Sequence, residues 1–275
     1  MVKPQLTIQL SDAQRIPQMG LGVWQASDDD ARVAVRVALE EGYRHVDTAS
    51  IYGNEKGVGE GLLDAGTPRE QVFLTTKIWN DAHGFESATS ALDASLVRMS
   101  VDYVDLLLIH WPAPGQDNYV DTWRAMIDAQ RNGKARSIGV SNFNPDHLKR
   151  LIDETGVAPV LNQIELHPSM QQQNLRQVHE SMGIATQSWS PLGQGSALTN
   201  PVILGIAQKY GRTAAQVVIR WHLELGLIAI PKSITPSRIR ENLNVFDFVL
   251  DTNDLVDIAS LDSGKRLGPD PSTFA

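Results

Sequence analysis

Cysteine is absent from this chain of 275 residues. Its absence excludes disulfide bonds, zinc sites with thiolate ligands and a cysteine nucleophile. Long apolar runs are also missing, since none reaches the roughly 18 residues that a helix needs to cross a bilayer. Residues 1–5 (Met-Val-Lys-Pro-Gln) lack the apolar block of a signal peptide. We therefore expect a cytoplasmic protein that does not bind a membrane.

Positive charge is in short supply. Asp and Glu number 32 against 24 Lys and Arg, which gives a formal net charge of −8 at pH 7. This balance opposes non-specific binding to nucleic acid, so nucleic acid is not an expected partner. Any phosphate group must be held by a local basic cluster.

Two catalytic motifs and one cofactor-binding motif are missing as well. The seven histidines show no His-Glu-x-x-His pattern and no close carboxylate cluster, so no catalytic metal is expected. No Gly-x-Ser-x-Gly elbow supports a serine hydrolase. No Gly-x-Gly-x-x-Gly fingerprint follows a first strand, which argues against a Rossmann domain.

What is present is an alternation of apolar, β-branched runs with amphipathic stretches in a chain that is 42% hydrophobic and 20% charged. The alternation predicts repeated βα units in one domain over residues 1–275, because barrels of eight such units take about 250 residues. Strands are expected at 20–23, 44–47, 72–77, 104–110, 137–140, 160–164, 185–188 and 227–230. Helical periodicity covers 29–41, 86–99, 121–131, 145–154 and 213–225.

Several segments mark boundaries of this pattern. Asn144 before Pro145 fits a helix N-cap, and Thr213 fits another. Residues 6–10 and 15–16 predict a small hairpin that closes the bottom of a barrel. The stretch after Leu261 is too rich in Gly and Pro for a regular element and is expected to cover the mouth. The predicted fold is an α/β (β/α)8 TIM barrel with an N-terminal hairpin and a C-terminal tail.

Three of the predicted strands end in ionisable side chains, namely Asp47, Lys77 and His110. The carboxyl ends of barrel strands converge on one mouth, where the active sites of this fold lie. Taken singly, each residue has a structural explanation, such as a turn cap, an exposed strand end or a satisfied buried histidine. Three complementary groups at three strand ends together favour a catalytic site.

With these residues in place, the chain resembles the aldo-keto reductases over nearly its full length. The matching segments are 42–49 (Gly-Tyr-Arg-His-Val-Asp-Thr-Ala), 52–55 (Tyr-Gly-Asn-Glu), Lys77, 139–143 (Gly-Val-Ser-Asn-Phe), 162–168 (Asn-Gln-Ile-Glu-Leu-His-Pro) and 230–233 (Ile-Pro-Lys-Ser). Within the family, residues 188–195 and 264–271 resemble the bacterial 2,5-diketo-D-gluconic acid reductases. The resemblance implies a barrel enzyme that uses NADPH to reduce carbonyl compounds.

The resemblance also implies a catalytic tetrad of Asp47, Tyr52, Lys77 and His110. Carbonyl reduction needs a proton for the oxygen, and Tyr52 is the implied acid. A free phenol has a pKa of about 10, too high for easy proton exchange at neutral pH, and we expect Lys77 to lower it. Asp47 would hold Lys77 charged, while His110 would bind the substrate carbonyl as a neutral donor.

Cofactor contacts are implied along the whole dinucleotide. Ser141, Asn142 and Gln163 would hold the nicotinamide carboxamide, and Trp189 would stack on the nicotinamide ring. The other implied contacts are Ser190, Leu192, Gln194, Lys232, Ser233, Arg238, Glu241 and Asn242.

The preference for NADPH over NADH depends on one cluster. Lys232, Ser233 and Arg238 lie where a helix begins, which suits the 2′-phosphate, with Glu241 and Asn242 near the adenine. The alternative is that Lys232 and Arg238 form an ordinary solvated helix start.

Substrate contacts are expected from Trp24, Ala49, Trp79 and Trp111, which follow or adjoin strand ends. Tryptophans are more often core residues than ligand contacts, but these positions favour the mouth. A flat aromatic wall suits small, planar carbonyl compounds without selecting one of them. The sequence does not indicate which residue would bind the carboxylate of a sugar acid.

The predicted function is NADPH-dependent reduction of small carbonyl compounds to alcohols, with 2,5-diketo-D-gluconate, reduced to 2-keto-L-gulonate, as the first candidate. A broad reductase of aldehydes or of α-dicarbonyls such as methylglyoxal is an alternative that uses the same residues. A redox-sensing regulatory module is a second alternative, which the intact tetrad disfavours. We expect a monomer.

Overall fold

The computed structural model describes residues 6–274. Its centre is a sheet of eight parallel strands that neighbour one another in chain order. They are β3 (Leu21–Gly22), β4 (His45–Asp47), β5 (Phe73–Ile78), β6 (Val104–Ile109), β7 (Ala135–Ser141), β8 (Leu161–Glu165), β9 (Ala185–Trp189) and β10 (Ile228–Ala229). Parallel bridges from Met19 to Ala229 and from Gly22 to Lys232 join the first strand to the last. The predicted barrel is confirmed, with every strand within two residues of its expected bounds.

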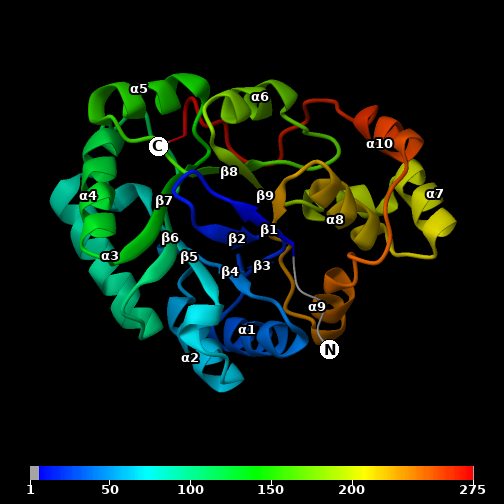
Figure 1. Ribbon diagram of the computed structural model, residues 1–275, viewed down its shortest axis with the longest axis horizontal. Helices are drawn as coiled ribbons and strands as arrows, with labels where there is room; N and C mark the ends of the chain where they lie inside the picture. The colour runs from blue at the N-terminus through cyan, green and yellow to red at the C-terminus, as the bar shows by residue number, and fades with distance from the viewer. Residues whose placement is uncertain (1–5, 275) are drawn as a thin grey trace.

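The helices lie outside this ring of strands (Figure 1). They are α1 (Asp28–Glu41), α2 (Glu55–Ala65), α3 (Phe85–Met99), α4 (Tyr119–Arg131), α5 (Pro145–Thr155), α6 (Gln173–Ser181), α7 (Pro201–Tyr210), α8 (Ala214–Glu224), α9 (Pro236–Leu243) and α10 (Thr252–Ala259). Among the residues described, no helix is both long enough and apolar enough to span a bilayer.

Both predicted helix caps are confirmed. Asn144 caps α5 with Pro145 in the first turn, and the side chain of His147 accepts a hydrogen bond from the Asn144 N–H at 3.2 Å. Thr213 caps α8, where the Thr213 hydroxyl and the Gln216 side chain exchange hydrogen bonds with each other's backbone N–H groups. Such reciprocal caps satisfy two backbone donors that the helix itself leaves unpaired.

The hairpin consists of the antiparallel strands β1 (Thr7–Gln9) and β2 (Arg15–Pro17). Figure 1 shows it crossing the centre of the ring of strands. Leu10 and Ile16 are buried there against Phe73, Leu106 and Leu161, so they fill the bottom of the barrel interior. The hairpin therefore closes one end of the barrel and leaves the site to the other end.

The tail runs from α10 past α6 towards α5 (Figure 1). The backbone carbonyl of Ser169 accepts hydrogen bonds from the N–H groups of Ser263 and Lys265, and Asn144 donates to the Ser272 hydroxyl at 3.0 Å. Parts of the tail line the cavity at the carboxyl ends of the strands. The expectation that the tail covers the mouth is confirmed.

Helix α2 directly follows the 3₁₀ turn η1 (Ser50–Tyr52) and packs unusually close to its neighbours. A Cβ atom on Gly57 would lie 2.0 Å from the Asp28 carbonyl oxygen, and one on Gly59 would lie 2.2 Å from that of Met99. Only glycine permits such backbone contacts between α2, α1 and the end of α3. This packing fixes the segment that carries Tyr52.

Candidate active site

A cavity of about 560 Å³ opens at the carboxyl ends of the strands. Its size lies in the range typical of small-molecule sites. The predicted site residues that line it are Trp24, Asp47, Tyr52, Trp79, His110, Trp111, Asn142, Gln163, Trp189, Ser190, Gln194 and Lys232. Lys77 contacts Tyr52 from beneath the cavity floor.

The other predicted site residues lie outside the lining. Ala49 and Ser141 are buried behind it, and the Ala49 carbonyl accepts a hydrogen bond from the Tyr52 N–H. Leu192 packs on the hydrophobic core. The remaining four belong to the segment around α9 and are Ser233, Arg238, Glu241 and Asn242.

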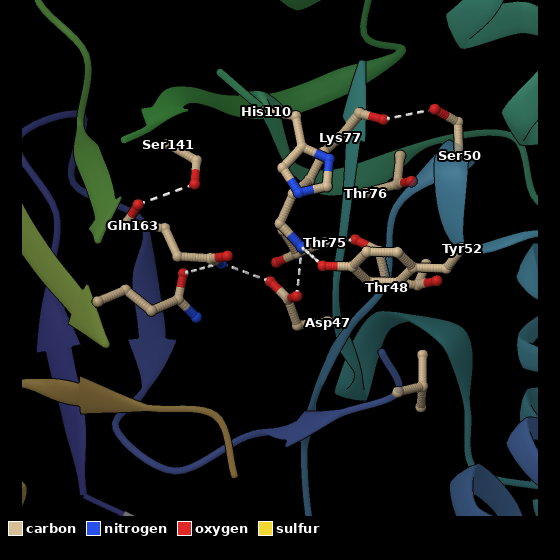
Figure 2. Close-up of polar contacts among 12 residues, drawn as sticks. Asp47, Thr48, Ser50, Tyr52, Thr75, Thr76, Lys77, His110, Ser141 and Gln163 are labelled. Atoms are coloured by element: carbon tan, nitrogen blue, oxygen red, sulfur yellow. Dashed lines mark hydrogen bonds and ion pairs between the residues drawn. The ribbon is translucent and has the colours of Figure 1, made fainter. Parts of the chain in front are cut away.

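The floor of the cavity is built on a buried ion pair (Figure 2). The Lys77 ammonium donates to Asp47 Oδ1 at 2.5 Å and to the Thr48 carbonyl at 2.8 Å, and both charged side chains are at most 2% exposed. The same ammonium lies 3.5 Å from the Tyr52 hydroxyl. Three residues from two strands and one turn therefore meet within hydrogen-bonding range.

A second layer of contacts orients this pair. Gln163 Nε2 donates to Asp47 Oδ2 at 2.7 Å and to Gln187 Oε1 at 2.9 Å, so both oxygens of Asp47 are bonded. The Ser50 hydroxyl donates to the Lys77 carbonyl at 3.0 Å. Figure 2 shows these partners on opposite sides of the pair. The pair is thereby held at a fixed position in the cavity floor.

His110 stands beside Tyr52 on the cavity wall. Its ring centroid lies 5.6 Å from that of Tyr52 and 5.0 Å from that of Trp79, in edge-on arrangements. Within residues 6–274, His110 Nδ1 is buried without a hydrogen-bond partner. The edge-on contacts fix the plane of the imidazole next to the tyrosine hydroxyl.

The electrostatics of the three groups differ. Burial lowers the pKa of His110 well below its ordinary value of 6.5, and Lys77 lowers it further, so the imidazole is neutral at pH 7. Burial also lowers the pKa of Lys77, but Asp47 and Tyr52 outweigh burial and raise it above 10.5, so the ammonium stays charged. For Tyr52, burial raises the pKa above 10 and exceeds the lowering by Lys77. Lys77 therefore lowers the pKa of Tyr52 as expected, but burial has the larger effect and the net shift of this pKa is upwards.

A third group of polar side chains lies at the ends of β7, β8 and β9. The Ser141 hydroxyl donates to the Gln163 carbonyl at 2.8 Å. Asn142 donates to the His110 carbonyl at 3.0 Å and accepts from the Trp189 indole N–H at 2.8 Å. Asn142 has φ of 65°, a left-handed conformation that Asn tolerates better than most residues. Through Asn142, which follows β7, this network ties the Trp189 ring at the end of β9 to the backbone of His110 at the end of β6.

The basic segment near α9 divides into free and occupied groups. Lys232 and Arg238 are exposed, and within residues 6–274 neither has a carboxylate partner. The Ser233 hydroxyl accepts from the Thr235 N–H at 3.2 Å. By contrast, Glu241 accepts from the Thr213 hydroxyl at 2.8 Å, and Asn242 is only 5% exposed. The cations are available to an anion, whereas Glu241 and Asn242 are engaged or buried.

Sequence reasoning missed one wall of the cavity. Leu267, Gly268, Pro269 and Phe274 of the tail line it. The Phe274 ring lies 4.7 Å from that of Trp111, and a second contact joins it to Trp79. The Gly and Pro content of the tail predicted its place over the mouth but gave no periodicity from which to choose inward-facing residues.

Within the described part of the chain, no group of three or more His, Asp or Glu side chains is arranged to hold a metal ion. The cavity combines a buried cation, a tyrosine hydroxyl, a neutral imidazole and an aromatic wall, a set suited to proton transfer and to binding a polarised oxygen.

Comparison with known proteins agrees with this arrangement. The sequence model of the Aldo/keto reductase family matches residues 18–263. The chain belongs to this family. This aldo/keto reductase is 55% identical over 273 residues to an aldo-keto reductase of Mycolicibacterium smegmatis, with 99% of this chain and 98% of the relative covered. It is also 55% identical over 269 residues to methylglyoxal reductase DkgA of Escherichia coli strain K12, with 97% of each covered.

Solved structures of relatives have the same fold as this aldo/keto reductase. The crystal structure of Gox0644 in its apo form superposes with a TM-score of 0.94 at 50% identity and covers 98% of both chains. A mutant of Gox0644 in complex with NADPH superposes with a TM-score of 0.95 at 49% identity, covering 99% of this chain and 100% of that one.

Proposed function

We propose that this chain is an NADPH-dependent reductase that converts small carbonyl compounds to alcohols, with Asp47, Tyr52, Lys77 and His110 as its catalytic residues. The observation that carries the proposal is the buried Asp47–Lys77 pair 3.5 Å from a tyrosine hydroxyl on a cavity wall. Membership of the aldo/keto reductase family and the NADPH complex of a 49% identical neighbour support it.

The donor set of the chain fits NADPH. Lys232 and Arg238 offer cations without carboxylate partners in the described part of the chain, which suits the 2′-phosphate. Trp189 presents a half-buried ring to the cavity beside Asn142 and Gln163, which suits the nicotinamide and its carboxamide. When bound, NADPH supplies the hydride for the carbonyl carbon.

The remaining cofactor contacts stay part of the proposal. Ser190 and Gln194 line the cavity and are assigned to the pyrophosphate, together with Leu192. Glu241 and Asn242 are assigned to the adenine side, where Glu241 would have to share its carboxylate with Thr213.

Tyr52 is assigned the proton for the carbonyl oxygen. Loss of that proton leaves a phenolate, which the Lys77 ammonium 3.5 Å away stabilises. Asp47 keeps that ammonium charged and in place. His110, being neutral at pH 7, retains one ring N–H with which to bond the carbonyl oxygen and polarise it.

The cavity favours an uncharged substrate. Around Tyr52 and His110 its wall is formed by Trp24, Trp79, Trp111 and Phe274. Among the lining residues described, the one Lys or Arg is Lys232, which is assigned to the cofactor. A carboxylate desolvated there would find no unpaired cation in the lining, because Lys77 lies beneath the floor and already pairs with Asp47, and such burial is costly. We therefore place uncharged α-dicarbonyls such as methylglyoxal ahead of 2,5-diketo-D-gluconate, which reverses the order expected from the resemblance. DkgA of Escherichia coli is itself named a methylglyoxal reductase.

Steady-state kinetics of the purified protein test this proposal. NADPH consumption is followed with methylglyoxal and with 2,5-diketo-D-gluconate, and we expect kcat/KM to be at least about tenfold higher for methylglyoxal, a difference of about 1.4 kcal/mol in transition-state binding. A preference for the sugar acid would reject the substrate assignment. Binding of NADPH without turnover of any carbonyl compound would instead support a redox-sensing module.

A further inference from the structure

We propose that Glu165 is a positioning residue that fastens the C-terminal tail as one wall of the substrate cavity. The inference rests on the proposed function and deepens it, because it names what sets the shape of the substrate site. Glu165 is the last residue of β8, two positions after Gln163, and it is completely buried.

Both oxygens of the Glu165 carboxylate hold consecutive backbone groups of the tail. The Leu267 N–H donates to Oε1 at 2.5 Å, and the Gly268 N–H donates to Oε2 at 3.0 Å. His167 Nε2 lies 3.0 Å from Oε1, and Arg266 Nη1 lies 3.8 Å from Oε2. Hydrogen bonds to an ionised group are about twice as strong as neutral ones, so this is a firm attachment.

The carboxylate remains ionised in this position. Burial raises the pKa of Glu165, but the hydrogen bonds from His167, Leu267 and Gly268 outweigh burial and hold the pKa below its ordinary value of 4.5. A buried charge of this kind persists only where such donors compensate for the lost water. The attachment therefore needs the charge as well as the shape of the side chain.

Gly268 brings the attached tail directly against Trp189. A Cβ atom on Gly268 would lie 2.5 Å from Cη2 of the Trp189 ring and 3.3 Å from Glu165 Oε2. The ring is not free to withdraw, because its N–H is bonded to Asn142. Any larger residue at 268 must therefore displace the tail or turn the indole.

The attached segment shapes the cavity around the reacting groups. Leu267, Gly268 and Pro269 line the cavity, and the same tail ends at Phe274, which packs on Trp111. Glu165 touches none of the catalytic residues in the structure described; it acts through the tail. Releasing the tail should weaken substrate binding more than it slows chemistry.

Asp105 provides a matched control. It is also a buried carboxylate on a barrel strand and also accepts a backbone hydrogen bond, from the Leu74 N–H at 3.0 Å, beside Arg69 and Arg136. Asp105 is the second residue of β6, at the strand end opposite His110. Its loss should lower stability without reaching the cavity.

The test compares Glu165→Gln with Asp105→Asn. In Glu165→Gln the side-chain NH2 group faces a backbone N–H of the tail, so one of the two acceptors is replaced by a second donor. We therefore expect hydrogen exchange at the 267 and 268 amides to accelerate at least about tenfold. Trypsin should then cleave after Arg266 at concentrations that leave the wild type intact. KM for methylglyoxal should rise about fivefold or more, while kcat and the Kd for NADPH stay within about twofold of wild type. Asp105→Asn should lower Tm and leave these quantities unchanged.

A second variant approaches the contact from the other side. Gly268→Ala keeps the Glu165 carboxylate and should still raise the KM for methylglyoxal, because its Cβ has no room beside Trp189. The proposal is overturned if exchange at 267 and 268 is unchanged in Glu165→Gln, or if KM changes no more than in Asp105→Asn. A wild-type protein that reduces no carbonyl compound would reject the proposed function, whereas the exchange and cleavage measurements would still decide whether Glu165 holds the tail.

Discussion

The Lys77 ammonium donates a hydrogen bond to Asp47 Oδ1 at 2.5 Å, and the protein shields both side chains from water. Buried ion pairs often contribute little to stability, because removing two charges from water costs as much as their attraction returns. The use of this pair is therefore better sought at the Tyr52 hydroxyl, which the same ammonium approaches at 3.5 Å. Asp47 and Gln163 hold the cation where a phenolate would form.

Asp47→Asn should destabilise the fold and reduce turnover together. The substitution leaves the buried Lys77 ammonium with only neutral acceptors and no anionic partner, which should lower the free energy of unfolding by about 3–5 kcal/mol. Urea unfolding and kcat measure the two effects. Asp93→Asn is the control, since Asp93 pairs with Lys134 at the surface and should contribute less than about 1 kcal/mol. Equal losses in both variants would contradict the assigned role of Asp47.

Tyr52→Phe should abolish most turnover while leaving cofactor binding intact. Removing the hydroxyl removes the proposed proton donor, and general acids contribute about 10²- to 10⁴-fold to rate. We expect kcat to fall within that range and the Kd for NADPH to stay within about twofold. Tyr103→Phe, at a ring that packs on Arg69 and Arg136, serves as the control. A Tyr52→Phe enzyme with normal kcat would reject the assignment.

Arg238→Ala should discriminate between the two nicotinamide cofactors. Its guanidinium has no carboxylate partner within residues 6–274, and we assign it to the 2′-phosphate. The Kd for NADPH should rise about tenfold or more, as expected for a lost hydrogen bond between charged groups, while that for NADH barely changes. Arg240→Ala is a control on the same helix, because Arg240 already pairs with Glu41 at 2.6 Å. Equal weakening of both cofactors by Arg238→Ala would contradict the phosphate contact.

The sequence predicted the structure best where burial requires apolar residues, as it does in the strands of the barrel. All six residues of β6 are buried, and the largely apolar run that contains them predicted the strand at 104–110. The polar residues that interrupt such runs at their carboxyl ends could then be assigned to one mouth, which gave Asp47, Lys77 and His110. The structure brings these side chains to one cavity floor and wall.

What the sequence did not reveal depends on contacts between distant segments. Glu165 lay inside a recognised motif, yet its partners Leu267 and Gly268 are about a hundred residues further along the chain, in an irregular segment with no periodicity. The net pKa shift of Tyr52 was likewise out of reach, because the charge of Lys77 can be counted but the burial that opposes it cannot. Both features are set by tertiary packing.

Acid should destabilise this protein already between pH 7 and pH 5.5, where carboxylates with ordinary pKa values barely titrate. Burial lowers the pKa of His45, His83, His179 and His222 from 6.5 to about 4, and it also lowers the pKa of His110 well below 6.5. As the pH falls below 6.5, these histidines take up protons in the unfolded chain but not in the folded one. The free energy of unfolding therefore decreases as the pH falls from 6.5 towards 4.

Urea unfolding at pH 7 and at pH 5.5 measures this effect, which should amount to about 1 kcal/mol for each such histidine one unit below its ordinary pKa. His83 offers a single-site check, because both of its ring nitrogens are buried without hydrogen-bond partners in the part of the chain described. His83→Phe removes a titrating group without breaking a hydrogen bond, so its stability should match the wild type at pH 7 and fall less by pH 5.5. Stability that stays level between the two pH values would show that these imidazoles can be protonated inside the fold.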